Sequence, residues 1–174
     1  FKGCRSLYGK AKLGCESLGQ AYNGIIVRTG LLFGEGEGSV LRSMESLVQK
    51  LPIVPLVSSK SILYLCHVAD LSSLIVEIIA KKEIDNRIIT AVEPTPYTIN
   101  DVIDILQKKH NRSRPVLPVP WQLPWFIIRI LNALGLQTSL RSDGLVGLVY
   151  QNKDPDVSSL TSYKTVFRSF AFYS

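Results

Sequence analysis

Short runs of β-branched and other apolar residues alternate along this chain with longer segments of helical periodicity. This alternation constrains the fold more than any other feature of the sequence. The short runs cover residues 24–30, 61–66 and 87–92. The helical segments cover residues 7–20, 40–50, 71–82 and 98–109. Strands that alternate with helices are typical of α/β folds, in which buried strands read as continuous apolar runs.

Local signals sharpen some of these boundaries. Thr98 and Asp101 have the spacing of a capping box, in which both side chains bond to backbone N–H groups at a helix start. Asp70 precedes the segment 71–82 and is expected to cap that helix. His67 is expected to be a structural residue that makes a hydrogen bond, rather than a catalytic base.

Three stretches give weaker signals. Residues 31–39 are expected to form a glycine-rich loop, and residues 51–56, which contain two prolines, an edge strand or a loop. The polar stretch 154–174 shows no periodicity, and we assign no element to it.

Composition excludes several classes of protein. The 174 residues carry a net charge of +6, with one basic cluster in 108–114. Without a continuous basic stripe or a binding motif, nucleic acid is not expected as a partner. The three cysteines lack motif spacing, which fits a reducing compartment and a cytoplasmic location. With two histidines and no CxxC pair, no metal site is expected.

The segment 121–136 is strongly apolar. It is shorter than the ~20 residues that a spanning helix needs, and Arg129 and Asn132 interrupt it. The sequence favours a buried or groove-forming amphipathic helix; the alternative is a helix on a membrane surface, which would make the protein peripheral to a membrane. The chain opens at Phe1 rather than Met, and we expect it to be a piece of a longer protein.

Tyr8 and Lys12 lie one turn apart on one face of the first expected helix. A phenol titrates near about pH 10, and a neighbouring ammonium lowers that pKa by stabilising the phenolate. A phenol tuned in this way can exchange a proton with a substrate hydroxyl or ketone while hydride moves to or from a nicotinamide. The same spacing also arises by chance in many helices, so the pair alone does not decide the function.

Four motifs follow one another in order: YGKAKLGCE, GIIVRTGLLFGEGEG, HVADLSSLIVEII and TAVEPTPYTINDVIDIL. This series resembles the second half of the extended short-chain dehydrogenase/reductase family, which contains sugar-nucleotide epimerases, dehydratases and reductases. The resemblance covers about residues 5 to 110 well and the remainder loosely. It is carried by Tyr8, Lys12, Glu16, Arg28, Phe33, Gly34, His67, Val68, Asp70, Leu71 and Thr98.

The resemblance implies an NAD(P)-dependent epimerase or 4-keto reductase that acts on a nucleotide-linked sugar. It makes Tyr8 the catalytic acid/base, while Lys12 lowers the pKa of Tyr8 and holds the nicotinamide ribose. The cofactor, NAD or NADP, would contact both residues and also Arg28, Thr29, Gly30 and Leu31. The sugar nucleotide would contact the helix from residue 39 and the region after residue 118. Candidate residues for it are Ser39, Arg42, Lys60 and Arg141.

The implied fold is a Rossmann-type parallel α/β sheet, of which this chain supplies the later strands, with a small C-terminal substrate-binding lobe. Residues 1–110 would form the second half of the NAD(P)-binding domain with interleaved lobe segments, and residues 111–174 the remaining lobe helices and tail. The family's dinucleotide loop and catalytic Ser/Thr precede the tyrosine and are absent here. The GEGEG stretch at 34–38 does not replace that loop, because its spacing differs and its two glutamates would repel a diphosphate.

Two further interpretations stay open. Family enzymes often dimerise through the tyrosine helix and its neighbour, so a homodimer is implied by resemblance only. The family also has non-catalytic members that serve as binding or assembly modules. Leu63 favours such a module, because several family enzymes have an arginine there for the substrate diphosphate; retention of Tyr8 and Lys12 argues against it. Expressed alone, the chain should bind NAD(P) weakly or not at all, because a parallel sheet without its first strands leaves edges uncovered.

Overall fold

The glycine-bracketed run at 24–30 forms strand β1 (Ile26–Thr29) in the computed structural model of the chain. β1 pairs in parallel with β6 (Ile88–Ala91), so that Ile26 lies opposite Ile88 and Thr29 opposite Ala91. Both strands were predicted by their apolar, β-branched sequences. The structure describes residues 5–34, 40–57, 61–81, 83–84, 87–120, 122–133, 152 and 154–173.

The four predicted helices are present as α1 (Leu7–Ala21), α2 (Val40–Lys50), α3 (Val68–Ala80) and α4 (Ile99–Lys109). The capping box at α4 is confirmed: Thr98 Oγ1 accepts the Asp101 N–H at 3.1 Å, and the Asp101 carboxylate accepts the Thr98 N–H at 2.7 Å. α1 and α4 are each followed by an asparagine in the left-handed region, which ends a helix: Asn23 has φ 54° and Asn111 φ 48°.

The start of α3 corrects one prediction. The N-cap is His67, whose Nδ1 accepts the Ala69 N–H at 3.1 Å, so its structural role is confirmed. Asp70 is not the cap, because the helix begins at Val68 and a capping side chain must precede the first helical residue. Asp70 lies inside the first turn, where its buried carboxylate binds Arg168.

The run at 61–66 is two strands rather than one. β4 (Ile62–Leu63) pairs antiparallel with β7 (Tyr97–Thr98), and β5 (Leu65–His67) pairs in parallel with β2 (Leu31–Phe33). The break falls at Tyr64. The sequence predicts a loop at β2. A three-residue strand is too short to show a recognisable pattern. The proline-containing stretch forms β3 (Val54–Val57), which pairs in parallel with β8 (Val116–Val119).

Gly30 marks the point where the chain passes from β1 to β2 and changes partner. The Gly30 N–H donates to the Ala91 carbonyl of β6 at 3.2 Å, and the Leu31 N–H donates to the Tyr64 carbonyl at 2.8 Å. A Cβ at position 30 would lie 2.4 Å from that Tyr64 oxygen. Only glycine allows the two backbones to approach this closely.

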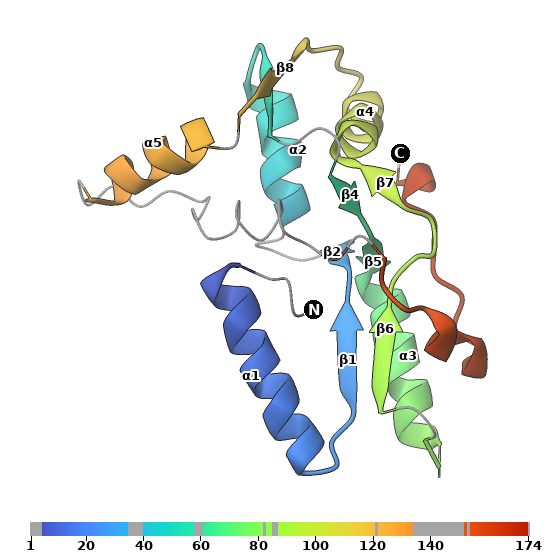
Figure 1. Ribbon diagram of the computed structural model, residues 1–174. Coiled ribbons are helices and arrows are strands. Elements are labelled where there is room, and N and C mark those ends of the chain that lie inside the picture. Colours follow the sequence, from blue (N-terminus) through green and yellow to red (C-terminus); the bar gives the residue numbers. More distant parts are fainter. Residues whose placement is uncertain are drawn as a thin grey trace.

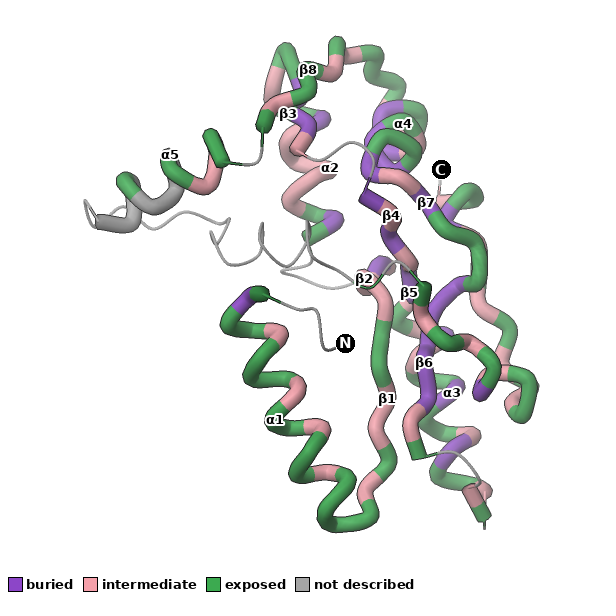
Figure 2. The backbone as a smooth tube through the Cα atoms, viewed as in Figure 1, coloured by how far each residue is buried: buried purple, intermediate pink, exposed green. Residues whose placement is uncertain are grey.

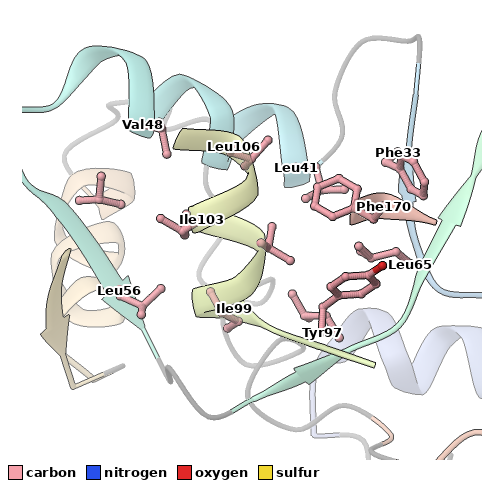
Figure 3. Close-up of a cluster of buried hydrophobic side chains, with 13 residues drawn as sticks. Phe33, Leu41, Val48, Leu56, Leu65, Tyr97, Ile99, Ile103, Leu106 and Phe170 are labelled. Carbon is pink, nitrogen blue, oxygen red and sulfur yellow. The ribbon is translucent and has the colours of Figure 1, made fainter. Parts of the chain in front are cut away.

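Two hydrophobic cores hold the elements together. The first lies around α2 and α4 (Figure 3) and consists of Phe33, Leu41, Val48, Val54, Leu56, Leu63, Leu65, Tyr97, Ile99, Val102, Ile103, Leu106 and Phe170. The second lies between α3 and β6 and consists of Cys66, Leu74, Ile78, Ile89 and Ala91. α1 and α3 lie on opposite sides of the β1–β6 pair (Figure 1).

Residues 154–173, to which the sequence assigns no element, form what we call the C-terminal strap. It contains the 3-10 helices η1 (Ser158–Ser162) and η2 (Phe170–Phe172) and runs alongside β6 and α3 (Figure 1). Phe170 is fully buried in the first core, while Leu160, Tyr163 and Phe167 pack against the second. Three carboxylates accept backbone N–H groups of the strap: Glu77 from Lys164, Asp70 from Arg168 and Glu93 from Phe170.

α1 contains no buried residue, although the structure describes its whole length (Figure 2). Leu7 and Leu18 are 75% and 63% exposed. Within the described part of the chain, β1 pairs along one edge only, with β6. Further strands of a parallel sheet would cover this open edge and the apolar side chains of α1.

The apolar segment after β8 forms α5 (Gln122–Ala133), which projects away from both cores (Figure 1). Its side chains Leu123, Phe126 and Ile130 are exposed. Among the described residues, no helix is both long and apolar enough to span a membrane.

Candidate functional site

The beginning of α1 presents Tyr8 and Lys12 next to each other. Ser6 caps the helix, with its Oγ accepting the Gly9 N–H at 3.0 Å. Lys12 Nζ lies 5.5 Å from the centroid of the Tyr8 ring, within range of a cation–π contact. Tyr8 is 68% exposed, so the structure brings the predicted pair together on an accessible face.

An ion pair fixes α1 along β1. Arg28 on β1 donates to both carboxylate oxygens of Glu16 on α1, from Nε at 3.0 Å and from NH2 at 2.7 Å. The hydrogen bonds from Arg28 hold the pKa of the Glu16 carboxyl below its usual value. Bidentate pairs of this kind fix orientation as well as distance. The guanidinium of Arg28 is therefore engaged within the protein, and its contact with a cofactor stays a prediction.

This ion pair also shows which residues stand level with each other. α1 and β1 run in opposite directions (Figure 1). Tyr8 lies about 12 Å from Glu16 along the helix at a rise of about 1.5 Å per residue. Leu31 lies about 10 Å beyond Arg28 at about 3.3 Å per residue of extended chain. Tyr8 therefore stands level with the end of β1 and the start of β2.

The predicted cofactor residues Thr29, Gly30 and Leu31 lie at this level. They stand at the carboxyl end of β1, where Thr29 is exposed and lies opposite Ala91 of β6. In open α/β sheets, ligands bind outside the carboxyl ends of parallel strands. These three residues thus lie at the end of the strand pair where such a ligand would bind, at about the same height as Tyr8.

The predicted substrate residues are only partly described. Arg42 is exposed on the first turn of α2 and lines a small recess with Phe33, Glu45 and Tyr173. Ser39, Lys60 and Arg141 lie outside the described residues, and so do residues 35–38 of the GEGEG stretch. Leu63 is 1% exposed inside the first core, so this position offers nothing to a substrate phosphate.

A larger pocket, of about 370 Å³, opens at the carboxyl ends of β2 and β5. Phe33 and His67 end these strands opposite each other, with ring centroids 5.0 Å apart and edge to face. The C-terminal strap supplies the other lining residues, which are Arg168, Ser169, Phe172 and Tyr173. Sequence reasoning missed all four. The signal that could have found them is the series of aromatic residues at 167, 170, 172 and 173 inside a polar stretch.

Two buried titratable groups lie beneath this region. Burial, together with the nearby Asp70 carboxylate, raises the pKa of the Cys66 thiol to about 12. Burial also raises the pKa of Tyr97, which donates to Glu93 at 2.7 Å and contacts Ser169 Oγ at 2.9 Å. Neither group is poised for chemistry at neutral pH. In the described part of the chain, no group of three or more His, Cys, Asp or Glu side chains could hold a metal ion.

No protein-family model matches the chain, and no curated protein sequence matches it. Several solved structures do. A dTDP-4-dehydrorhamnose reductase from Bacillus anthracis, in complex with NADP, matches with a TM-score of 0.58 and 20% identity over 81% of this chain and 53% of that chain. A dTDP-4-dehydrorhamnose reductase from Clostridium acetobutylicum matches with a TM-score of 0.56 and 21% identity over 65% of this chain and 40% of that chain. A dTDP-glucose 4,6-dehydratase from Bacillus anthracis, in complex with NAD, matches with 0.58 and 14% over 83% and 51%.

These likenesses establish the fold. The chain is mixed α/β with parallel strands and resembles part of the Rossmann-type structures of sugar-nucleotide reductases and dehydratases. It spans about half the length of those proteins or less. The α/β fold that the four-motif resemblance implies is thereby confirmed.

Proposed function

We propose that this chain belongs to an NAD(P)-dependent enzyme of the extended short-chain dehydrogenase/reductase type, acting on a nucleotide-linked sugar as an epimerase or 4-keto reductase. The observation that carries the proposal is the position of Tyr8, which is exposed, adjacent to Lys12 and level with the carboxyl end of β1. The fold supports it, because matching structures include a reductase in complex with NADP and a dehydratase in complex with NAD.

In this proposal Tyr8 exchanges a proton with the sugar. Its phenol oxygen takes the proton from a hydroxyl as that carbon is oxidised, and returns it when the ketone is reduced. Lys12 places a positive charge next to the ring, where negative charge develops as the proton leaves. The ion pair between Glu16 and Arg28 keeps α1 at a fixed height along β1, which holds the phenol in place.

The described residues fit a nicotinamide cofactor at this end of the sheet. Tyr8 and Thr29 are both exposed there, and Gly30 carries no side chain where the backbone passes from β1 to β2. When bound, the cofactor supplies the acceptor and donor of hydride. Lys12 would hold the ribose hydroxyls through its ammonium N–H groups, and residues 29–31 would line the ring.

The substrate-binding lobe is also a proposal. Arg42 on α2 is the described candidate for contact with the sugar nucleotide. Of the predicted lobe segment 111–174, β8 and α5 are described, and β8 pairs with β3. The division of the chain at residue 110 stays a prediction; the structure pairs β3 with β8 across that boundary. The cytoplasmic location, the homodimer and the contact of α5 with a membrane surface also stay predictions.

The experiment is a turnover assay of the full-length protein with UDP-, GDP- and dTDP-linked sugars, each with NAD and with NADP. We expect turnover with one class of sugar nucleotide and loss of most of it in Lys12→Met. Lys10→Met is the matched control, because Lys10 lies on the same helix but about 200° around it, and this variant should keep its activity.

The same assay tests the competing function. A folded protein that binds the cofactor but turns over no sugar nucleotide would favour a non-catalytic binding or assembly module. Leu63 is the observation that favours this alternative, since its place in the core removes one expected phosphate contact.

A further inference from the structure

The pocket at the carboxyl ends of β2 and β5 contains neither Tyr8 nor Lys12, and the function proposed above does not use it. Its volume of about 370 Å³ is that of a small-molecule site, and its lining of aromatic, apolar and a few polar groups is also typical of one, but the pocket is wide open to solvent and would enclose only part of a ligand. Here the aromatic groups are Phe33, Phe172 and Tyr173, and the polar groups are His67, Arg168 and Ser169.

Arg168 is held so that part of its guanidinium stays available. The buried Asp70 carboxylate accepts the Arg168 backbone N–H at 2.7 Å, and Arg168 Nε forms an ion pair with the other carboxylate oxygen at 2.9 Å. The side chain is nevertheless 60% exposed. A guanidinium fixed through Nε in this way presents an edge of N–H donors that suits a carboxylate or phosphate.

Charged side chains of both signs lie around the described part of the pocket. Arg42 lines the adjoining recess, which shares Phe33 and Tyr173 with the pocket. Lys109 Nζ lies 3.6 Å from the Tyr173 ring centroid. Among the described residues, Lys109 pairs with Glu45 and Arg168 pairs with Asp70, while the Glu93 carboxylate lies buried behind Phe170.

His67 adds a further donor. Because its Nδ1 accepts the Ala69 N–H, the proton of the neutral ring is on Nε2. That nitrogen would lie 3.0 Å from a Cβ at Gly34, where φ is +114°. Glycine at position 34 therefore leaves room for the imidazole beside the pocket.

The rings of the pocket differ in how firmly they are held. Tyr173 stacks on Phe170 with centroids 5.3 Å apart and meets Phe33 edge-on at 5.4 Å. Phe172, in contrast, is 85% exposed at the rim. Phe172 is thus a large apolar ring exposed to water beside the firmly packed rings of Tyr173 and Phe33. Covering it with another planar ring is energetically favourable.

We propose that this pocket binds a small planar aromatic compound that carries a phosphate or carboxylate group. Arg168 binds the anionic group, and Phe172 and Tyr173 contact the ring. This inference does not depend on sugar-nucleotide chemistry at Tyr8.

The test is calorimetric titration of the full-length protein with phenyl phosphate and with inorganic phosphate. The unchanged protein should bind phenyl phosphate at least about tenfold more tightly than inorganic phosphate, because only phenyl phosphate covers the rings. Arg168→Ala should weaken phenyl phosphate by about tenfold or more. Arg112→Ala, at an exposed arginine that does not line the pocket, is the matched control and should bind as the unchanged protein does.

Phe172→Ala separates the two contacts and carries little risk to folding, since the ring is exposed. This variant should bind phenyl phosphate several-fold more weakly and bind inorganic phosphate as the unchanged protein does. Tyr8→Phe should change neither affinity, which separates this site from the proposed active site. The proposal is overturned if phenyl phosphate binds no more tightly than inorganic phosphate, or if Arg168→Ala binds it as tightly as the unchanged protein.

Discussion

Removing the carboxylate of Glu93 should loosen the C-terminal strap. Glu93 follows β6 and is 3% exposed. One carboxylate oxygen accepts the Tyr97 hydroxyl at 2.7 Å, and the other accepts the Phe170 N–H at 2.9 Å. The Phe170 ring lies in the first core, so this carboxylate joins the strap to the core at its most buried point.

The structure gives the expected magnitude. Glu93→Ala leaves the Phe170 N–H without its acceptor and leaves the Tyr97 hydroxyl with its contacts in the strap. A buried polar group that loses its partner costs about 1–3 kcal/mol, and only the Phe170 N–H loses its partner here, so we expect a loss of about 1–3 kcal/mol. In Glu93→Gln the amide oxygen can still accept from Phe170, and the amide NH2 can donate to the Tyr97 oxygen. That variant should lose only about 1 kcal/mol.

The assay is thermal unfolding of the full-length protein combined with hydrogen exchange of the strap amides. At about 2–4 °C per kcal/mol, Glu93→Ala should melt about 2–12 °C lower, and the amides of residues 164–171 should exchange faster. Glu83→Ala, at an exposed carboxylate after α3, is the matched control. If Glu93→Ala melts and exchanges like this control, the carboxylate does not hold the strap and the reasoning is wrong.

Three further predictions use the same readouts or simple chemistry. Thr98→Ala should destabilise the protein by about 1 kcal/mol through loss of the helix cap, whereas Thr98→Ser should keep most of that stability in thermal unfolding. The hydrogen bonds from Arg28 lower the pKa of Glu16 below its ordinary value of 4.5. The ion pair therefore stabilises the fold fully above pH 4.5 and loses this effect as the pH falls through the lowered pKa. In Glu16→Gln the melting temperature should fall less steeply as the pH is lowered. Iodoacetamide at about pH 8 should label the exposed Cys15 and spare Cys66, whose buried thiol has a pKa of about 12; mass spectrometry showing equal labelling would contradict this burial.

Elements that depend on local signals could be predicted from the sequence. The capping box at Thr98 needs only residues three apart, and the strand at 26–29 needs only a β-branched run between glycines. The helices α1 to α4 follow from periodicity alone. The predicted cap of α3 failed because the sequence places the helix start after Asp70, whereas α3 begins at Val68 and is capped by His67.

Elements that depend on distant partners could not be predicted. The break at Tyr64 exists because β4 pairs with β7, which follows it in the sequence, whereas β5 pairs with β2, which precedes it. The strap has no periodicity, and its backbone donates to carboxylates that lie 77 to 98 residues earlier in the chain. The candidate site divides in the same way. Tyr8 and Lys12 follow from spacing and resemblance, whereas Arg168 enters the second pocket only through the fold of the strap.

The most direct test of the account is the activity of Tyr8→Phe beside Tyr22→Phe in the full-length protein, with the sugar nucleotide that it turns over. Both tyrosines are exposed residues of α1 or its C-cap, so each substitution removes one hydroxyl from the same helix. If Tyr8 is the acid/base, kcat/KM should fall about 100- to 10,000-fold in Tyr8→Phe and stay unchanged in Tyr22→Phe. Equal activity of the two variants would contradict the assignment of Tyr8, and with it the proposed mechanism.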